Sequence, residues 1–163
     1  MTDILIRPLE PSDADWVRRW IAAHWGGPSV VVHGVVYHPG TLPGFAAFDG
    51  DTPVGLITYT LADHAGEIVS LDSERPRRGI GTALIDAVVA AARAAGCRRV
   101  WLITTNDNLD ALRFYQRRGF RLAAAYPDAV AAARRLKPQI PLVGDHGIPI
   151  RDEIELEVPL DYA

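Results

Sequence analysis

The feature that most constrains the fold of this chain is the junction at residues 77–84, which reads Arg-Arg-Gly-Ile-Gly-Thr-Ala-Leu. A strand-like apolar run ends before it, and an alanine-rich helical run begins within it. Gly79 and Gly81 allow a tight turn and leave the backbone N–H groups uncovered. About four amide donors in a first helical turn lack intrahelical partners, and the helix dipole places about half a positive charge there. The junction therefore predicts a phosphate site at a helix N-terminus.

Arginines beside the junction indicate which kind of anion it binds. Arg75, Arg77 and Arg78 add full positive charges, which indicates a polyanion such as a pyrophosphate. A P-loop would need Gly, any four residues and then Gly-Lys-Ser/Thr, and the sequence contains no such string. A dinucleotide fingerprint would need a third glycine at Leu84 and, about twenty residues on, an acidic residue near Thr104. A helix that merely begins with glycines stays the alternative interpretation.

A second motif lies at residues 108–120, Asn-Leu-Asp-Ala-Leu-Arg-Phe-Tyr-Gln-Arg-Arg-Gly-Phe. With the glycine junction it resembles the GNAT superfamily of N-acetyltransferases, which pairs an Arg/Gln-x-x-Gly-x-Gly loop with a downstream Asn-x-x-Ala-x-x-Phe-Tyr-x-x-x-Gly-Phe segment. The resemblance covers residues 67–120. Pro76 departs from the first motif where the family has Arg or Gln, so we expect a neighbouring arginine to supply that charge. Every position of the second motif matches: Asn108, Ala111, Phe114, Tyr115, Gly119 and Phe120.

The resemblance implies an acetyl-CoA-dependent N-acetyltransferase that acts on a small-molecule or peptide amine. It also implies an α/β (α+β) fold with a central mixed, mostly antiparallel sheet flanked by helices, whose splayed central strands admit the pantetheine arm. The implied acetyl-CoA-binding residues are Val69, Leu71, Arg77, Arg78, Gly79, Ile80, Gly81, Thr82 and Asn108. Two other classes stay open, a non-catalytic acyl-CoA-binding module and a nucleotide-binding regulator.

Composition favours a single domain over residues 1–163, because a chain with 48% hydrophobic residues can bury one sizeable core at this length. The net charge of −3 provides no general attraction to nucleic acid. Cys97, the single cysteine, suits a reducing cytoplasm, and we expect no signal peptide or membrane span. We expect a monomer or homodimer. The five histidines show no metal-ligand spacing, so no metal site is expected.

Apolar periodicity and turn residues predict the order of elements. Helices are expected from Ser12 or Asp13 to residue 24, at 80–95, at 108–118, and after residue 128 to 136. Strands are expected at residues 4–9, 45–48, 54–61, 67–71, 99–104, 120–126 and 153–158. Residues 30–37 are rich in β-branched side chains, and Gly34 indicates a bulge or turn among them. The last strand alternates acidic and apolar residues, and its acidic face is expected to be solvated.

Acetyl transfer to an amine defines three chemical roles. The amine must lose a proton, and Glu67 is the candidate base, with a solvated or substrate-binding glutamate as the alternative. The resemblance implies that Tyr115 lies near the CoA sulfur and protonates the leaving thiolate. Backbone N–H groups of residues 69–71 are expected to stabilise the oxyanion. Asn108 is expected both to cap its helix and to contact the pantetheine.

The sequence does not determine which residues bind the acceptor. Asp63 and His64 precede Glu67, although loop solvation explains them equally well. His146 lies in a glycine-rich segment of the loop at residues 137–149, which could close over an acceptor.

Overall fold

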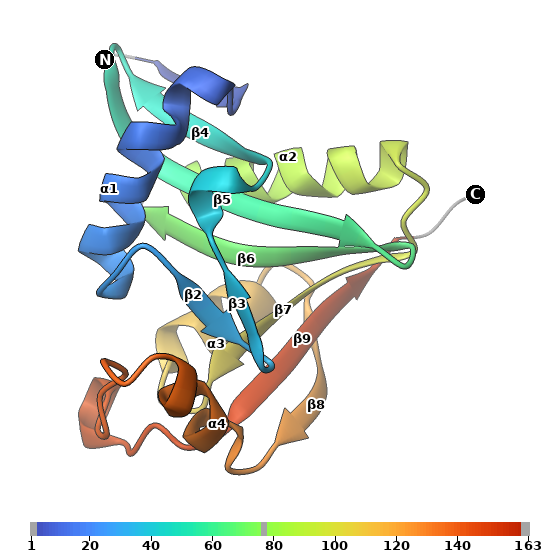
Figure 1. Ribbon diagram of the computed structural model, residues 1–163. Helices are drawn as coiled ribbons and strands as arrows, with labels where there is room; N and C mark the ends of the chain where they lie inside the picture. The colour runs from blue at the N-terminus through green and yellow to red at the C-terminus, as the bar shows by residue number, and fades with distance from the viewer. Residues whose placement is uncertain (1–2, 76–77, 161–163) are drawn as a thin grey trace.

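The computed structural model describes residues 3–75 and 78–160, within which seven strands form one sheet in the order β1-β4-β5-β6-β7-β9-β8 (Figure 1). Neighbouring strands of this sheet are antiparallel except for the β6–β7 pair. The described helices are α1 (Ala14–Trp25), α2 (Ile80–Ala94), α3 (Leu109–Gln116) and α4 (Ala129–Leu136). The strands are β1 (Ile4–Pro8), β2 (Val30–Val32), β3 (Val35–Tyr37), β4 (Gly44–Asp49), β5 (Thr52–Ala62), β6 (Ala65–Ser73), β7 (Arg99–Thr105), β8 (Arg121–Tyr126) and β9 (Glu153–Pro159).

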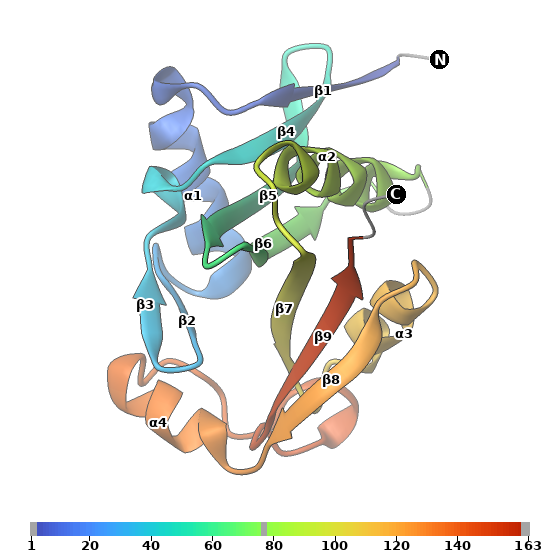
Figure 2. The same ribbon diagram turned by 90° about the vertical axis from the view of Figure 1, so that its right-hand side faces the viewer.

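Two hydrophobic clusters lie on opposite faces of the sheet. On one face, the apolar residues of α2 pack with α3 against the strands, around fully buried side chains such as Leu84 and Val88. On the other face, Ile21 of α1 packs with Val32 of β2 against Leu56 of β5. Figure 2 shows this layering, with α1 and the β2–β3 hairpin on one side and α2 and α3 on the other. The predicted α/β architecture with a mixed, mostly antiparallel sheet is confirmed.

The sheet opens between β6 and β7. The two strands pair from Ala65 and Arg99 to Ile68 and Leu102, and both strands then continue without pairing to one another. On its other side, β6 pairs with β5 through a bulge in which Val69 is the extra residue. A bulge bends its strand and increases the local twist, which carries β6 away from β7. The predicted splay of the central strands is confirmed, and it begins where the donor-binding residues were expected.

One element confirms the sequence expectation and another differs from it. The segment at residues 30–37 is a hairpin of two short strands with a turn at Gly34, where His33 and Gly34 both take positive φ angles, 41° and 77°. The acidic face of β9 is not simply solvated. Glu153 is only 5% exposed, and Glu155 and Glu157 form ion pairs with Arg99. The alternation predicted which side of β9 is acidic but not that the hairpin and α4 cover it.

Candidate active site

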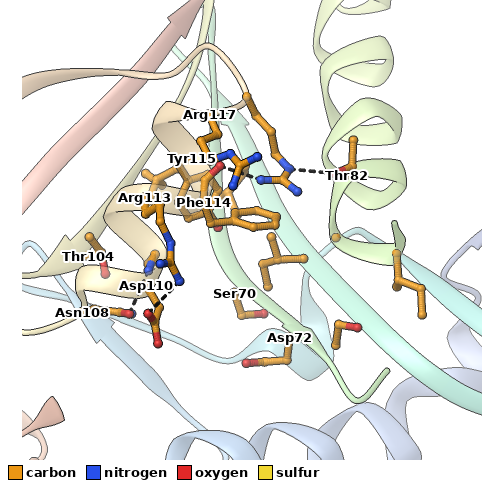
Figure 3. A pocket seen from close by; sticks show the side chains of 18 of the residues that line it. Ser70, Asp72, Thr82, Thr104, Asn108, Asp110, Arg113, Phe114, Tyr115 and Arg117 are labelled. Carbon is orange, nitrogen blue, oxygen red and sulfur yellow. Dashed lines mark hydrogen bonds and ion pairs between the residues drawn. The ribbon is translucent and has the colours of Figure 1, made fainter. Parts of the chain in front are cut away.

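A cavity of about 870 Å³ occupies the splay, bounded by the unpaired halves of β6 and β7, the N-terminus of α2 and the whole of α3 (Figure 3). Residues from segments far apart in the sequence meet there, because α2 and α3 both border the region where β6 and β7 separate. Eight residues expected from the sequence line this cavity, which we call the donor cavity: Val69, Leu71, Gly79, Ile80, Gly81, Thr82, Asn108 and Tyr115. Arg78 is exposed and lies outside the lining, and Arg77 falls outside the described residues.

The two glycines of the junction have different structural roles. Gly79 adopts a left-handed conformation at the N-cap of α2, with φ of 71°, which a side chain would strain. Gly81 lies beneath the ring of Phe114, and a Cβ at Gly81 would come within 2.8 Å of Phe114 Cζ. Gly81 therefore lets α3 approach the first turn of α2. The amide donors of that turn lie at the cavity, as an anion site requires.

Positive charge at the cavity comes partly from Arg75, which the sequence analysis named and which also pairs with Asp49 at 2.7 Å. Further positive charge comes from α3 and its C-terminal end, which the sequence analysis missed. Arg113, Arg117 and Arg118 line the cavity. Arg118 donates to Thr82 Oγ1 at 2.7 Å and to the Phe114 carbonyl at 2.7 Å, and its guanidinium carbon lies 3.5 Å from the centre of the Phe114 ring. The spacing of arginines three to five residues apart on a predicted helix was the signal that could have identified them.

Asn108 caps α3, because its Oδ1 atom accepts a hydrogen bond from the Ala111 N–H at 3.1 Å. This confirms the capping role, and the same side chain borders the donor cavity. A single Asn therefore orders the helix that carries Tyr115 and also contributes to the wall of the cavity.

Tyr115 is buried at the inner wall of the donor cavity, with 7% of its surface exposed. Its ring makes edge-to-face contacts with Phe114 and Phe120, at centroid distances of 5.2 and 5.3 Å. Burial and the negative charge of Asp72 raise the pKa of Tyr115, and the charge of Arg118 partly offsets this effect. The phenol therefore stays protonated at neutral pH and can serve as a proton donor.

Glu67 lies outside the donor cavity, on the face of β6 that the β2–β3 hairpin covers. It is 4% exposed, and both of its carboxylate oxygens are engaged. Oε2 lies 2.7 Å from His33 Nε2, and Oε1 accepts a hydrogen bond from the Tyr37 hydroxyl at 2.7 Å. Burial, followed by this hydrogen bond, raises the pKa of Tyr37, so Tyr37 remains a donor to Glu67. The structure thus links Glu67 to His33, which the sequence analysis left unassigned.

A second cavity, of about 510 Å³, lies on the hairpin side of β7. His33 and Trp101 line it together with Glu153 and Glu155 of β9. Ile103 lines both this cavity and the donor cavity, so β7 forms part of the wall of each.

The other residues considered for the acceptor end lie outside both cavities. Asp63 and His64 form the exposed turn between β5 and β6, and neither they nor His146 line either of these two cavities in the described parts of the chain. Within residues 3–75 and 78–160, no group of three or more His, Cys, Asp or Glu residues could hold a metal ion. None of the helices described is both long and apolar enough to cross a membrane.

Comparison with known proteins agrees with this geometry. The model of the acetyltransferase (GNAT) family matches residues 7–120. Two Bacillus subtilis (strain 168) proteins, YdhI and YxbD, are 47% and 46% identical to the chain over 143 residues, which cover 87% of the chain and 89% and 90% of those proteins.

Solved structures share the fold. A Bacillus subtilis acetyltransferase in complex with CoA has a TM-score of 0.68 at 19% identity, covering 97% of this chain and 99% of that one. A GNAT family acetyltransferase from Elizabethkingia anophelis with acetyl-CoA bound also has a TM-score of 0.68 at 19% identity, covering 98% and 100%.

Proposed function

The chain belongs to the acetyltransferase (GNAT) family, and we propose that it transfers an acetyl group from acetyl-CoA to a small-molecule or peptide amine. The observation that carries this proposal is the donor cavity, where the N-terminus of α2, the sheet splay and Tyr115 meet. Two structural neighbours that share the fold bind CoA or acetyl-CoA, which supports the same donor here.

The donor cavity fits a long ligand with an anionic end and a narrow arm. The amides of residues 79–82 bind the pyrophosphate, and Arg113, Arg117 and Arg118 add positive charge along the same wall. The arm enters the splay, where β6 has no β7 partner beyond Ile68 and its backbone can pair with the ligand instead. Val69 and Leu71 border this part of the cavity.

Acetyl-CoA supplies the thioester carbonyl that the amine attacks. The N–H groups of residues 69–71 stabilise the negative charge that develops on the carbonyl oxygen. As the C–S bond breaks, Tyr115 donates its phenolic proton to the sulfur, so the products are an N-acetylated amine and CoA thiol. The nitrogen loses its second proton as the amide forms, and water passes this proton to the Tyr115 phenolate.

The amine must first lose a proton, and we assign this step to His33 with Glu67 as its positioning residue. The Nε2–H group of His33 donates to Glu67 Oε2, which leaves Nδ1 with a lone pair in the neutral ring. Glu67 cannot easily accept the proton itself, because His33 and Tyr37 already occupy its two oxygens. Glu67 therefore fixes the tautomer of His33, whose ring borders the second cavity.

A CoA-release assay over a panel of amines tests the proposed function. Release of CoA thiol that depends on the amine, together with CoA binding measured by calorimetry, is the expected result. Tight CoA binding with no thiol release from any amine or peptide would instead identify a non-catalytic acyl-CoA-binding module. Tighter binding of a dinucleotide than of CoA would indicate a nucleotide-binding regulator.

A further inference from the structure

The second cavity is lined by acidic and aromatic side chains. We call it the acceptor chamber and define it by His33, Trp101, Tyr126, Ala129, Glu153 and Glu155. The β2–β3 hairpin contributes His33, α4 contributes Ala129, and the sheet contributes the other four. A volume of about 510 Å³ lies within the range of small-molecule sites.

The carboxylates of the chamber differ in their partners. Glu155 forms an ion pair with Arg99 at 2.8 Å and accepts a hydrogen bond from the Tyr126 hydroxyl at 2.8 Å. Glu153 is buried, with 5% of its surface exposed. Its Oε2 atom accepts a hydrogen bond from the His33 backbone N–H at 3.2 Å. Within residues 3–75 and 78–160, no Lys, Arg or His side chain forms an ion pair with Glu153. A buried carboxylate without a cation is costly, so its placement indicates that a ligand supplies the positive charge.

Aromatic rings extend this preference for cations. The Trp101 ring lies 5.3 Å from the His33 ring, and the Arg99 guanidinium lies 5.0 Å from the Trp101 ring centre. The electron-rich faces of Trp and Tyr attract positive charge. The same rings also provide apolar area for the methylene groups of a ligand.

Ile103 of β7 borders both the chamber and the donor cavity. Ile103 pairs with Glu155 across β7 and β9, and the next pair on the same face joins Thr105 to Glu153. Two residues along a strand span about 7 Å. A ligand with one end at the splay and a cation at Glu153 must therefore bridge about this distance, as a short alkyl chain does.

Hydrogen bonds of Lys137 fix α4 beside the chamber. Lys137, at the end of α4, is 6% exposed and donates to the carbonyl oxygens of Trp25 and Ser29 at 2.6 and 2.7 Å. These bonds attach the end of α4 to the C-terminal end of α1 and to the loop between α1 and β2. The helix that contributes Ala129 to the chamber is thus fixed in place, and the volume of the chamber favours a small molecule.

We infer that the acceptor chamber binds a small primary amine that carries a second positive charge, with one ammonium group at Glu153 and the reacting nitrogen at Ile103, which borders both cavities. This inference rests on the proposed acetyl transfer and specifies its substrate class. An amine that carries a carboxylate is disfavoured, because the carboxylate would face Glu153, whose charge no cation of the described residues balances.

Three amines of the same length test the inference: 1,4-diaminobutane, 1-aminobutane and 4-aminobutanoate. With saturating acetyl-CoA, kcat/KM for CoA-thiol release should be about 10- to 100-fold higher for the diamine than for 1-aminobutane, as expected for one added charge-assisted contact. The rate with 4-aminobutanoate should be the lowest. Equal rates with all three amines, or a higher kcat/KM with an N-terminal tripeptide amine than with the diamine, would overturn the inference while leaving acetyl transfer intact.

Substitution of the buried carboxylate supplies the residue-level test. Glu153→Gln should abolish the preference for the diamine through a higher KM, with calorimetric CoA affinity unchanged. Asp51→Asn removes one negative charge from the exposed β4–β5 turn and should keep the full preference. Retention of the preference in Glu153→Gln would overturn the assignment. If this variant does not fold, the wild-type comparison of the three amines decides by itself.

Failure of the proposed function is recognised separately. If no amine releases CoA thiol, calorimetric titration of 1,4-diaminobutane into the CoA complex still examines the chamber. Binding of the diamine but not of 4-aminobutanoate would support the chamber and reject the catalytic proposal. Absence of diamine binding would reject the chamber.

Discussion

Replacement of Tyr115 by Phe removes a single hydroxyl from the donor cavity and leaves the aromatic packing in place. The edge contacts with Phe114 and Phe120 involve only the ring, so the free energy of unfolding should change by less than about 1 kcal/mol. The phenol faces the CoA sulfur in the proposed mechanism. We therefore expect the loss to affect the chemical step and not donor binding.

The magnitude follows from the relative acidity of the phenol and the leaving thiol. A phenol of pKa about 10 is a weaker acid than a thiol of pKa about 8.5, and burial raises the pKa of Tyr115 further. Complete proton transfer before C–S cleavage would thus be uphill by at least about 2 kcal/mol. The transfer must accompany bond cleavage, and loss of a general acid of this kind lowers kcat by about 10²- to 10⁴-fold.

Steady-state rates of CoA-thiol release, with CoA affinity from calorimetry, check this prediction. The matched control is Tyr59→Phe, because Tyr59 is also buried, stacks on Phe45 and does not line the donor cavity. A wild-type kcat in Tyr115→Phe would refute the general-acid role and reassign Tyr115 to packing. An equal loss in both variants would show that the rate responds to core packing.

Three further predictions concern the anion site, proton removal and acid stability. Gly81→Asp should weaken CoA binding in calorimetry at least about tenfold, and by more than Gly81→Ala does. The reason is that Asp adds a negative charge to the steric contact at the helix N-terminus. Equal CoA affinities of the two variants would exclude a phosphate at this turn. Glu67→Gln should reduce turnover at pH 7, and part of the rate should return at higher pH, where more of the amine is neutral. His33→Gln should behave in the same way. A rise in the acceptor KM alone, at every pH, would contradict proton removal by this pair. The hydrogen bond from Arg7 lowers the pKa of Asp13, burial opposes this effect, and hydrogen bonds from the Glu10 N–H and the Trp16 indole lower the pKa further. The contribution of Asp13 to stability is therefore present above about pH 4 and is lost as the pH falls through the lowered pKa. Asp13→Asn should therefore lower the free energy of unfolding by about 1–3 kcal/mol at pH 7, and denaturant titrations should show this difference shrinking in acid.

The donor side of the site was readable from the sequence because its determinants are local. Gly79 and Gly81 specify a helix start directly after a strand, and Asn108 caps the helix that carries Tyr115 seven residues later. Each of these features depends on neighbours within a few positions along the chain. The arginines of α3 were also available in the sequence, but their direction toward the α2 N-terminus depends on how Gly81 admits Phe114.

The second cavity, which we propose as the acceptor site, was decided only by tertiary structure. The alternation in β9 predicted a common face for Glu153 and Glu155, yet the residues that cover this face come from the hairpin and from α4. The partner of Glu67 is His33, which is 34 positions away in the sequence and is placed by the turn between β2 and β3. A period of two residues determines which side of a strand a group occupies, whereas its burial, its partners and its charge balance depend on which distant segment packs over it.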